Sequence, residues 1–218
     1  NRFIESSPGS GLIASASLLC GEALYRTGAH QQAATHLRRV VDEHGDDGAC
    51  DPALLRLGEC LAALQLWPGS EAAFAEYLRR FGDSELWFQA QFGVGWAMEN
   101  QGRFDEAIAE YRKVIDRHSG PTAARAQFQI GECLYAGRQF EDAARELLKV
   151  DILYACPEWS AAALYEAGRC FEELGRPHEA AAQYERLQEE HGKTRWAELA
   201  GERLLSLQPA PLPGRADG

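Results

Sequence analysis

The sequence predicts an all-α protein, built as an α-solenoid of about five helix-turn-helix repeats with a C-terminal capping helix. The 218 residues include 35 Ala and 25 Leu but only 5 Val, 6 Ile and 4 Thr, so the β-branched residues that favour strands are scarce. Glycine is frequent for a helical chain, at 21 residues, and five of these glycines recur at a nearly constant spacing. Between them, apolar residues follow the period of amphipathic helices.

The spacing of the recurring glycines defines the repeat. The steps between them are 37, 37, 36 and 37 residues, and the glycines are Gly21, Gly58, Gly95, Gly131 and Gly168. Twelve residues after four of them stands an alanine, namely Ala33, Ala107, Ala143 and Ala180. Four residues later comes a large side chain, namely Leu37, Tyr111, Leu147 and Tyr184. The second repeat is expected to break this offset, because its Ala73 and Tyr77 arrive three residues late.

Each repeat is predicted to contain two antiparallel helices joined by a short turn. In the third repeat the first helix covers residues 86–101, Gly102 ends it, and the second helix runs to about His118. The same break in repeats one, four and five is assigned to Gly28, Gly137 and Gly175. A helix pair of this size cannot bury its own apolar face, so we expect neighbouring pairs to stack on one another.

The domain boundaries follow from this phase. Residues 1–9 are predicted to be a lead-in, with Ser10 as an N-cap, and residues 208–218 a flexible Pro-rich tail. The array itself covers residues 10–207 and consists of repeats at about 10–48, 50–83, 84–119, 120–156 and 157–192, followed by a capping helix at 193–207. The capping helix is amphipathic, so its apolar side should cover the last repeat.

Two segments carry a resemblance to a known family. The residues GWAM at 95–98 with GRFDEAIAEY at 102–111 resemble the tetratricopeptide (TPR) signature, and residues 168–184 repeat it. The resemblance implies a scaffold that binds other proteins through the concave groove formed by the first helices. Long second helices ending in a histidine are similar to those of bacterial cell-envelope TPR proteins, such as Tol-Pal-associated coordinators and outer-membrane assembly lipoproteins. That narrower resemblance implies a periplasmic or envelope location, with a cytoplasmic one as the alternative.

Charge and hydropathy exclude several partner classes. The formal net charge of −11 argues against nucleic acid, because phosphate backbones are bound by clustered Lys and Arg. No apolar stretch approaches the roughly 18 residues needed to span a membrane. We therefore predict neither a nucleic-acid partner nor a membrane span in this chain.

Cysteine and histidine are predicted to have structural roles. Cys60, Cys133 and Cys170 each follow a repeat glycine by two residues, where other repeats have Ala, so the position is a small core site. Cys50 and Cys156 lie in inter-repeat turns and are expected to be the exposed thiols; whether either forms a disulfide is left open. The histidines at helix ends, namely His44, His118 and His191, lie one or more repeats apart and are not expected to share a metal ion. We predict no catalytic site, cofactor or metal.

The candidate binding residues come from the positions that face the groove in the family's geometry. These are the positions three before, one after and four after each repeat glycine. From the fifteen residues at these positions the candidates are Glu22, Tyr25, Glu59, Phe92, Trp96, Glu99, Glu132, Tyr135, Arg169 and Glu172.

The chemistry of this set favours a basic partner. Co-chaperones of the family that clasp a C-terminal carboxylate have Lys, Arg and Asn at these positions, whereas five of the ten candidates here are Glu and only Arg169 is basic. Glutamates beside aromatic rings favour a partner segment that carries Lys or Arg, with cation–π contact at Trp96. The competing interpretation is that these glutamates are solubilising charges and that Trp96 covers a neighbouring helix.

The sequence therefore predicts a non-catalytic scaffold for protein-protein interaction, in an envelope-associated assembly. The alternative is a regulatory or oligomerisation segment of a larger multidomain protein. Neither the identity of the partner nor the oligomeric state follows from the sequence.

Overall fold

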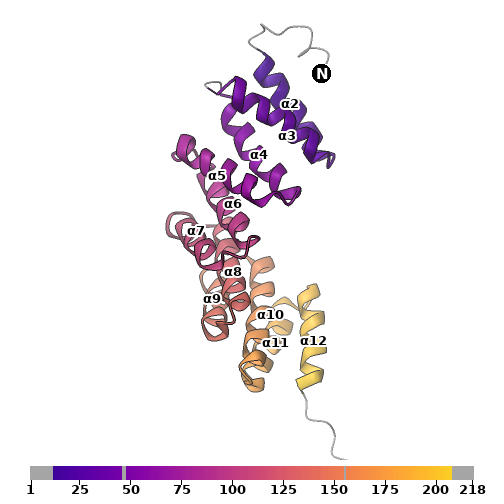
Figure 1. Cartoon of the computed structure of the whole chain (residues 1–218). Helices are drawn as coiled ribbons and strands as arrows, with labels where there is room; N and C mark the ends of the chain where they lie inside the picture. Colours follow the sequence, from indigo (N-terminus) through magenta and orange to yellow (C-terminus); the bar gives the residue numbers. More distant parts are fainter. Residues whose placement is uncertain (1–11, 46–47, 155, 208–218) are drawn as a thin grey trace, which may run out of the picture. The chain divides into compact units, whose positions relative to one another are not determined.

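The computed structural model describes residues 12–45, 48–154 and 156–207, which form only helices and the turns between them (Figure 1). The helices are α2 (Ile13–Arg26), α3 (His30–Glu43), α4 (Cys50–Ala63), α5 (Trp67–Phe81), α6 (Trp87–Glu99), α7 (Phe104–Arg117), α8 (Pro121–Ala136), α9 (Phe140–Leu153), α10 (Pro157–Glu173), α11 (Pro177–His191) and α12 (Arg195–Leu207). The all-helical class predicted from composition is confirmed. The predicted lead-in at 1–9, the N-cap at Ser10 and the tail at 208–218 lie outside the described residues.

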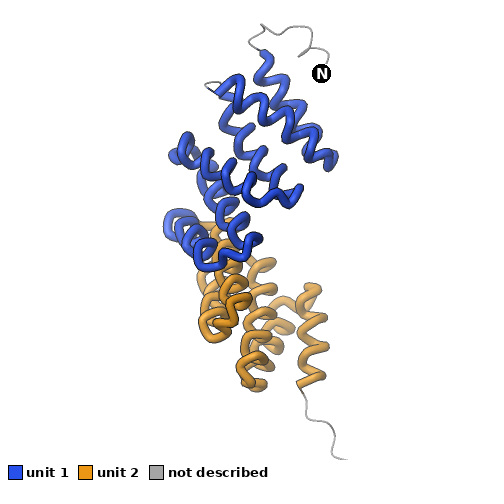
Figure 2. Tube along the Cα trace, viewed as in Figure 1, with its two compact units in different colours: residues 1–118 blue, residues 119–218 orange. Residues whose placement is uncertain are grey.

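The helices divide into two compact units, α2 to α7 and α8 to α12 (Figure 2). Within each unit consecutive helices pack together. The first helix of each pair also packs on the first helix of the next, as α2 does on α4, α4 on α6, α8 on α10 and α10 on α12. Among the described residues the second helices show no comparable packing on one another. Each unit thus has a continuous layer of first helices, and this layer holds the candidate binding residues.

The repeat glycines lie where the first helix of a pair meets the second. A Cβ atom on Gly21 would lie 2.7 Å from the Leu37 side chain, and one on Gly168 would come still closer to the Tyr184 ring. Both large partners are fully buried. The glycines therefore let a bulky residue of the second helix reach the backbone of the first.

The prediction that the second repeat breaks the offset is wrong. A Cβ on Gly58 would lie 2.6 Å from the ring of Phe74, which stands at the usual offset of sixteen residues. The small position of this repeat is Ser70, which is fully buried and donates a hydrogen bond from Oγ to the Gly58 carbonyl at 2.9 Å. The repeat pattern in the sequence missed Ser70 and Phe74 because a serine stands where the other repeats have alanine. Ala73 and Tyr77, about one helical turn later, have the same spacing as the expected pair.

The turns inside the pairs share one backbone conformation. The residue seven positions after each repeat glycine has a positive φ, and in three repeats it is glycine, as at Gly102 with φ +74°. In the fourth repeat Gly137 ends the first helix, as predicted, but the residue with the positive φ is Arg138, with φ +59°. Gln65 takes the same conformation in the second repeat. A left-handed residue lets the last carbonyls of a helix accept hydrogen bonds from the turn, as between Ala29 N–H and the Leu24 carbonyl at 2.9 Å.

The last helix closes the second unit. Ala197 and Ala200 of α12 are buried and join a hydrophobic cluster with Leu164 of α10 and Tyr184 of α11. The ring of Trp196 lies 5.4 Å from that of Tyr165. The apolar side of α12 therefore covers the fifth helix pair.

Candidate interaction surface

The candidate binding residues lie on the first helices and fall into the two units. Glu22, Tyr25, Glu59, Phe92, Trp96 and Glu99 belong to the first unit, and Glu132, Tyr135, Arg169 and Glu172 to the second. All except Phe92 are partly exposed. The structure brings some of them together in two clusters. Others contact the protein's own core or its second helices.

The first cluster joins α2 and α4 and is formed by Glu22, Tyr25, Arg56 and Glu59; we call it the α2–α4 cluster. Arg56 donates from Nε to Glu22 Oε1 at 3.0 Å and from Nη1 to Glu59. Its guanidinium carbon lies 4.6 Å from the centre of the Tyr25 ring, a cation–π distance. One arginine therefore bridges two carboxylates and stacks on Tyr25, one of the predicted binding residues.

Burial sets the electrostatics of this cluster. Loss of solvent raises the pKa of the Glu59 carboxyl above its ordinary value, and the charge of Arg56 offsets only part of that rise. The pKa of the Tyr25 hydroxyl is also raised, first by burial and then by the nearby Glu59 charge. A further cation placed beside Glu59 would stabilise its ionised form.

The second cluster joins α8 and α10 and is formed by Tyr135, Glu166 and Arg169; we call it the α8–α10 cluster. Arg169 donates from Nη1 to Glu166 Oε2 at 2.7 Å and from Nη2 to the Tyr135 hydroxyl at 2.9 Å. Its guanidinium carbon lies 4.8 Å from the centre of the Tyr135 ring. Burial raises the pKa of Glu166 in spite of the adjacent arginine. Glu132 lies on α8 with one fully buried carboxylate oxygen.

The two clusters use the same repeat positions with opposite charges. In the second repeat the residue two before the glycine is Arg56 and the residue one after it is Glu59. In the fifth repeat the same two positions hold Glu166 and Arg169. Each cluster thus has an arginine over a tyrosine of the preceding repeat, but the arginine stands on a different turn of the helix.

Four predicted residues contact the protein's own interior or its other helices. Phe92 is only 6% exposed and its ring lies 5.2 Å from that of Tyr111, so it is a packing residue. Trp96 contacts Trp67 of α5 edge to face, with ring centres 5.5 Å apart. Two carboxylates accept hydrogen bonds of 2.6 Å from buried tyrosines of the second helices, Glu99 from Tyr111 and Glu172 from Tyr184.

Sequence reasoning missed several residues of this surface. Arg56 and Glu166 stand two residues before a repeat glycine, one helical turn from the predicted position, and their i,i+3 charge pairing was a usable signal. Arg203 of α12 donates from Nε to Glu172 at 3.0 Å, from 31 residues away. No local pattern marks such a tertiary contact.

Most of the cysteines are buried packing residues. One of them, Cys50, differs from its prediction. Cys60, Cys133 and Cys170 are buried, and all six cysteines are free thiols. Burial raises the pKa of Cys60 and of Cys170 to about 12, which keeps these thiols protonated. The expectation that Cys50 is exposed is wrong, since Cys50 begins α4 and is fully buried there. Cys156 is partly exposed.

Among the helices of the described residues, none combines the length and the apolar character needed to cross a membrane.

Comparison with family models places most of the chain in one family. Two models described as tetratricopeptide repeat match it, one over residues 21–85 and 90–154 and the other over residues 162–194. No curated protein matches the sequence significantly.

Solved structures show the same fold at low sequence identity. MamA from Desulfovibrio magneticus RS-1, residues 41 to the end, is 17% identical, with a TM-score of 0.69 over 84% of this chain and 97% of that one. YrrB, described as a TPR protein with an unusual peptide-binding site, is 15% identical, with a TM-score of 0.63 over 92% and 96%. A thermophilic TPR protein of Thermus thermophilus is 19% identical, with a TM-score of 0.57 over 89% and 98%.

Proposed function

Because this chain belongs to the tetratricopeptide repeat family, whose fold serves protein-protein interaction, we propose that it is a non-catalytic scaffold. In this proposal it binds a protein or peptide partner along the layer of first helices in each unit. Peptide binding by a protein of the same fold, YrrB, is in keeping with this proposal.

The α2–α4 and α8–α10 clusters are the main support for this function. In each, an arginine stacks on a tyrosine of the neighbouring repeat, and both side chains are partly exposed. Tyrosine and arginine are among the side chains most enriched where partners contribute binding energy, because each offers a large apolar surface and a polar end. The clusters stand on the first helices, at positions a partner lying along that layer would contact.

The partner proposed for the α2–α4 cluster carries lysine or arginine. The cluster has two carboxylates for one guanidinium, and burial raises the pKa of Glu59. A cationic side chain beside Glu59 would compensate the excess negative charge and could stack on Tyr25. With a net charge of −11, we propose that nucleic acid is not a partner.

Two substitutions with opposite expected effects test this charge preference. Fluorescence anisotropy with a Lys/Arg-rich peptide and a Glu-rich peptide measures binding to the full chain at low salt. Glu59→Gln should weaken binding of the basic peptide roughly fivefold, about 1 kcal/mol, because it removes an attractive charge. Arg56→Gln should strengthen it, because the internal competitor for both carboxylates is gone.

The control is Glu185→Gln, which makes the same change of net charge on an exposed position of the second helix α11. It should leave the affinity unchanged. If Arg56→Gln and Glu59→Gln weaken binding equally, or if the wild-type chain prefers the Glu-rich peptide, the charge preference is wrong while the scaffold proposal stands.

We further propose that the scaffold serves an envelope-associated assembly, on the resemblance of its long, histidine-ended second helices to those of bacterial cell-envelope TPR proteins. Fractionation of cells that express the full-length gene from its own start should recover the protein with the envelope or periplasm. Recovery only in the cytoplasm would refute this location. Among the described residues no observation favours the alternative of a regulatory or oligomerisation segment.

A further inference from the structure

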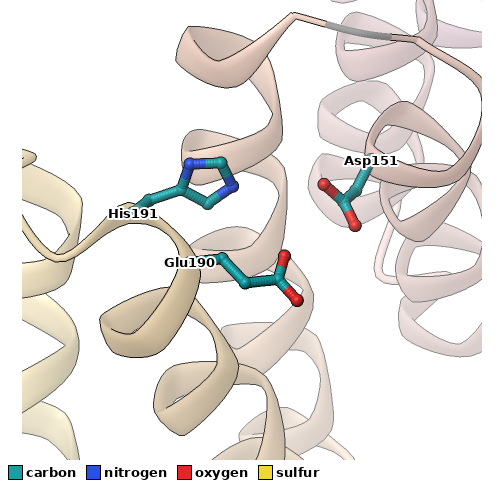
Figure 3. Close-up of side chains that lie close together, drawn as sticks. All are labelled: Asp151, Glu190 and His191. Atoms are coloured by element: carbon teal, nitrogen blue, oxygen red, sulfur yellow. The ribbon is translucent and has the colours of Figure 1, made fainter.

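Three side chains of types that can bind a metal come together between the second helices of the fourth and fifth pairs. Asp151 stands near the end of α9, and Glu190 and His191 stand at the end of α11 (Figure 3). One donor atom from each side chain can be chosen so that all three lie within 4.8 Å of one another. Within the described part of the chain these two helices do not otherwise pack together, so the cluster joins two neighbouring repeats.

The Nε2 atom of the His191 imidazole has no hydrogen-bond partner among the described residues. This atom is fully buried. In Figure 3 the ring points toward the carboxylates of Asp151 and Glu190. A buried polar atom without a partner costs free energy, and a ligand that satisfied Nε2 would recover it.

Each carboxylate uses one oxygen in a hydrogen bond, and its second oxygen makes none within the part of the chain that the structure describes. Arg186 donates from Nε to Glu190 Oε1 at 2.9 Å and from Nη2 to Asp151 Oδ2. The side chain of Asp151 is 11% exposed, so its orientation is well fixed. Carboxylates that bind a metal are commonly oriented by hydrogen bonds from residues that do not touch the metal. Arg186 donates such hydrogen bonds to both Asp151 and Glu190.

We propose that Asp151, Glu190 and His191 bind one divalent transition-metal ion of the Zn²⁺ class. Two carboxylate oxygens and one imidazole nitrogen suit a borderline ion, whereas Mg²⁺ and Ca²⁺ prefer oxygen ligands alone. With Arg186 included, the four side chains carry a net charge of −1 when the imidazole is neutral. A hollow lined by residues 188–194 opens beside Glu190 and His191 and gives the ion access.

The proposal differs from what the histidine positions alone predict. His118, at the same repeat position as His191, instead stacks on Phe88, with ring centres 3.8 Å apart. The proposed ligands are one histidine, its neighbour Glu190 and an aspartate of the preceding repeat. That aspartate has no counterpart at the same position of the other second helices.

Zn²⁺ titration of the full chain tests the site directly. Calorimetry should show one Zn²⁺ bound per chain, and Co²⁺ should give a visible spectrum without the thiolate charge-transfer band that cysteine ligands would produce. His191→Ala and Asp151→Asn should each weaken Zn²⁺ binding at least tenfold. Zn²⁺ should raise the Tm of the wild-type chain and not that of His191→Ala, because only the bound native state is stabilised.

The matched control is His118→Ala, which removes the histidine at the same repeat position and should bind Zn²⁺ as the wild type does. Glu190→Gln, at an exposed side chain, replaces Asp151→Asn if the loss of the Arg186 contact unfolds the latter variant. Unchanged Zn²⁺ affinity in His191→Ala, or a thiolate band with Co²⁺, would overturn the proposal. The scaffold proposal is independent of either result.

Discussion

At the scale of the residue, close packing against glycine is the feature on which each helix pair depends. Tyr184 lies against Gly168, and its hydroxyl is held by Glu172 at 2.6 Å. Because both ends of this tyrosine are fixed, the ring cannot move aside for a new side chain. Protein interiors tolerate little extra volume, since neighbours must leave their preferred rotamers.

Gly168→Ala is therefore expected to destabilise the second unit. Overpacking costs about 1–3 kcal/mol and alanine returns about 1 kcal/mol of helix propensity, so a net loss of roughly 1 kcal/mol should remain. The midpoint of urea unfolding, followed by circular dichroism, measures it. Gly48→Ala is the control, because a Cβ there meets nothing within 4 Å and the backbone is not left-handed. If Gly168→Ala is as stable as the wild type or more stable, the Tyr184 ring moves aside for the added methyl group.

Sequence alone located most of these contacts because glycine spacing is set by backbone geometry. It missed Phe74, whose ring would clash with a Cβ on Gly58 or on Gly93, both at under 3 Å. The small residue beside it is a serine, and a serine oxygen bonded to a carbonyl fills a site that apolar pattern matching assigns to alanine. Likewise, Arg56 was missed because its role depends on Tyr25 and Glu22 of another helix.

At the scale of the element, the turns and the last helix define where each pair ends. Arg138 and Gln65 adopt the left-handed conformation that glycine takes in the other three turns. The sequence could not reveal this, since the repeated backbone geometry overrides the preference of the residue type. By contrast, the apolar side of α12 was readable from its amphipathic pattern. The hydrogen bond from Arg203 of this helix to Glu172 could not be predicted from that pattern.

A charge on the buried side of α12 should disrupt the end of the second unit. Ala200 is fully buried, and an uncompensated charge in such a place costs about 3–5 kcal/mol. Ala200→Glu should therefore lower the Tm strongly, whereas Ser206→Glu on the exposed side of the same helix should leave it nearly unchanged. A small effect of Ala200→Glu would mean that α12 does not cap the fifth pair.

At the scale of the whole molecule, each helix pair contacts only its neighbours within its unit, as far as the described residues show. Stability in such arrays is approximately a sum of nearest-neighbour terms. Hydrogen exchange on Ala200→Glu should therefore show faster exchange in α10, α11 and α12 and unchanged exchange in α2 to α5. Acceleration throughout both units would instead indicate one cooperative core.

Family and fold were accessible from the sequence at this scale, because one signature recurs five times in phase. The interaction surface was accessible only in part. Tyr25, Glu59, Tyr135 and Arg169 stand where a partner could contact them, but Phe92 is buried and Glu99 and Glu172 hold buried tyrosines. Repeat position gives the helix face of a side chain, whereas its partners depend on the neighbouring repeats.

The exchange of arginine and glutamate between the α2–α4 and α8–α10 clusters has a consequence for valency. A ligand whose charges match Arg56 and Glu59 meets the opposite order at Glu166 and Arg169. If both clusters bind partners as proposed, repetition of the fold does not duplicate one binding site. The chain would then have two different sites, each selecting a segment with its own order of charges.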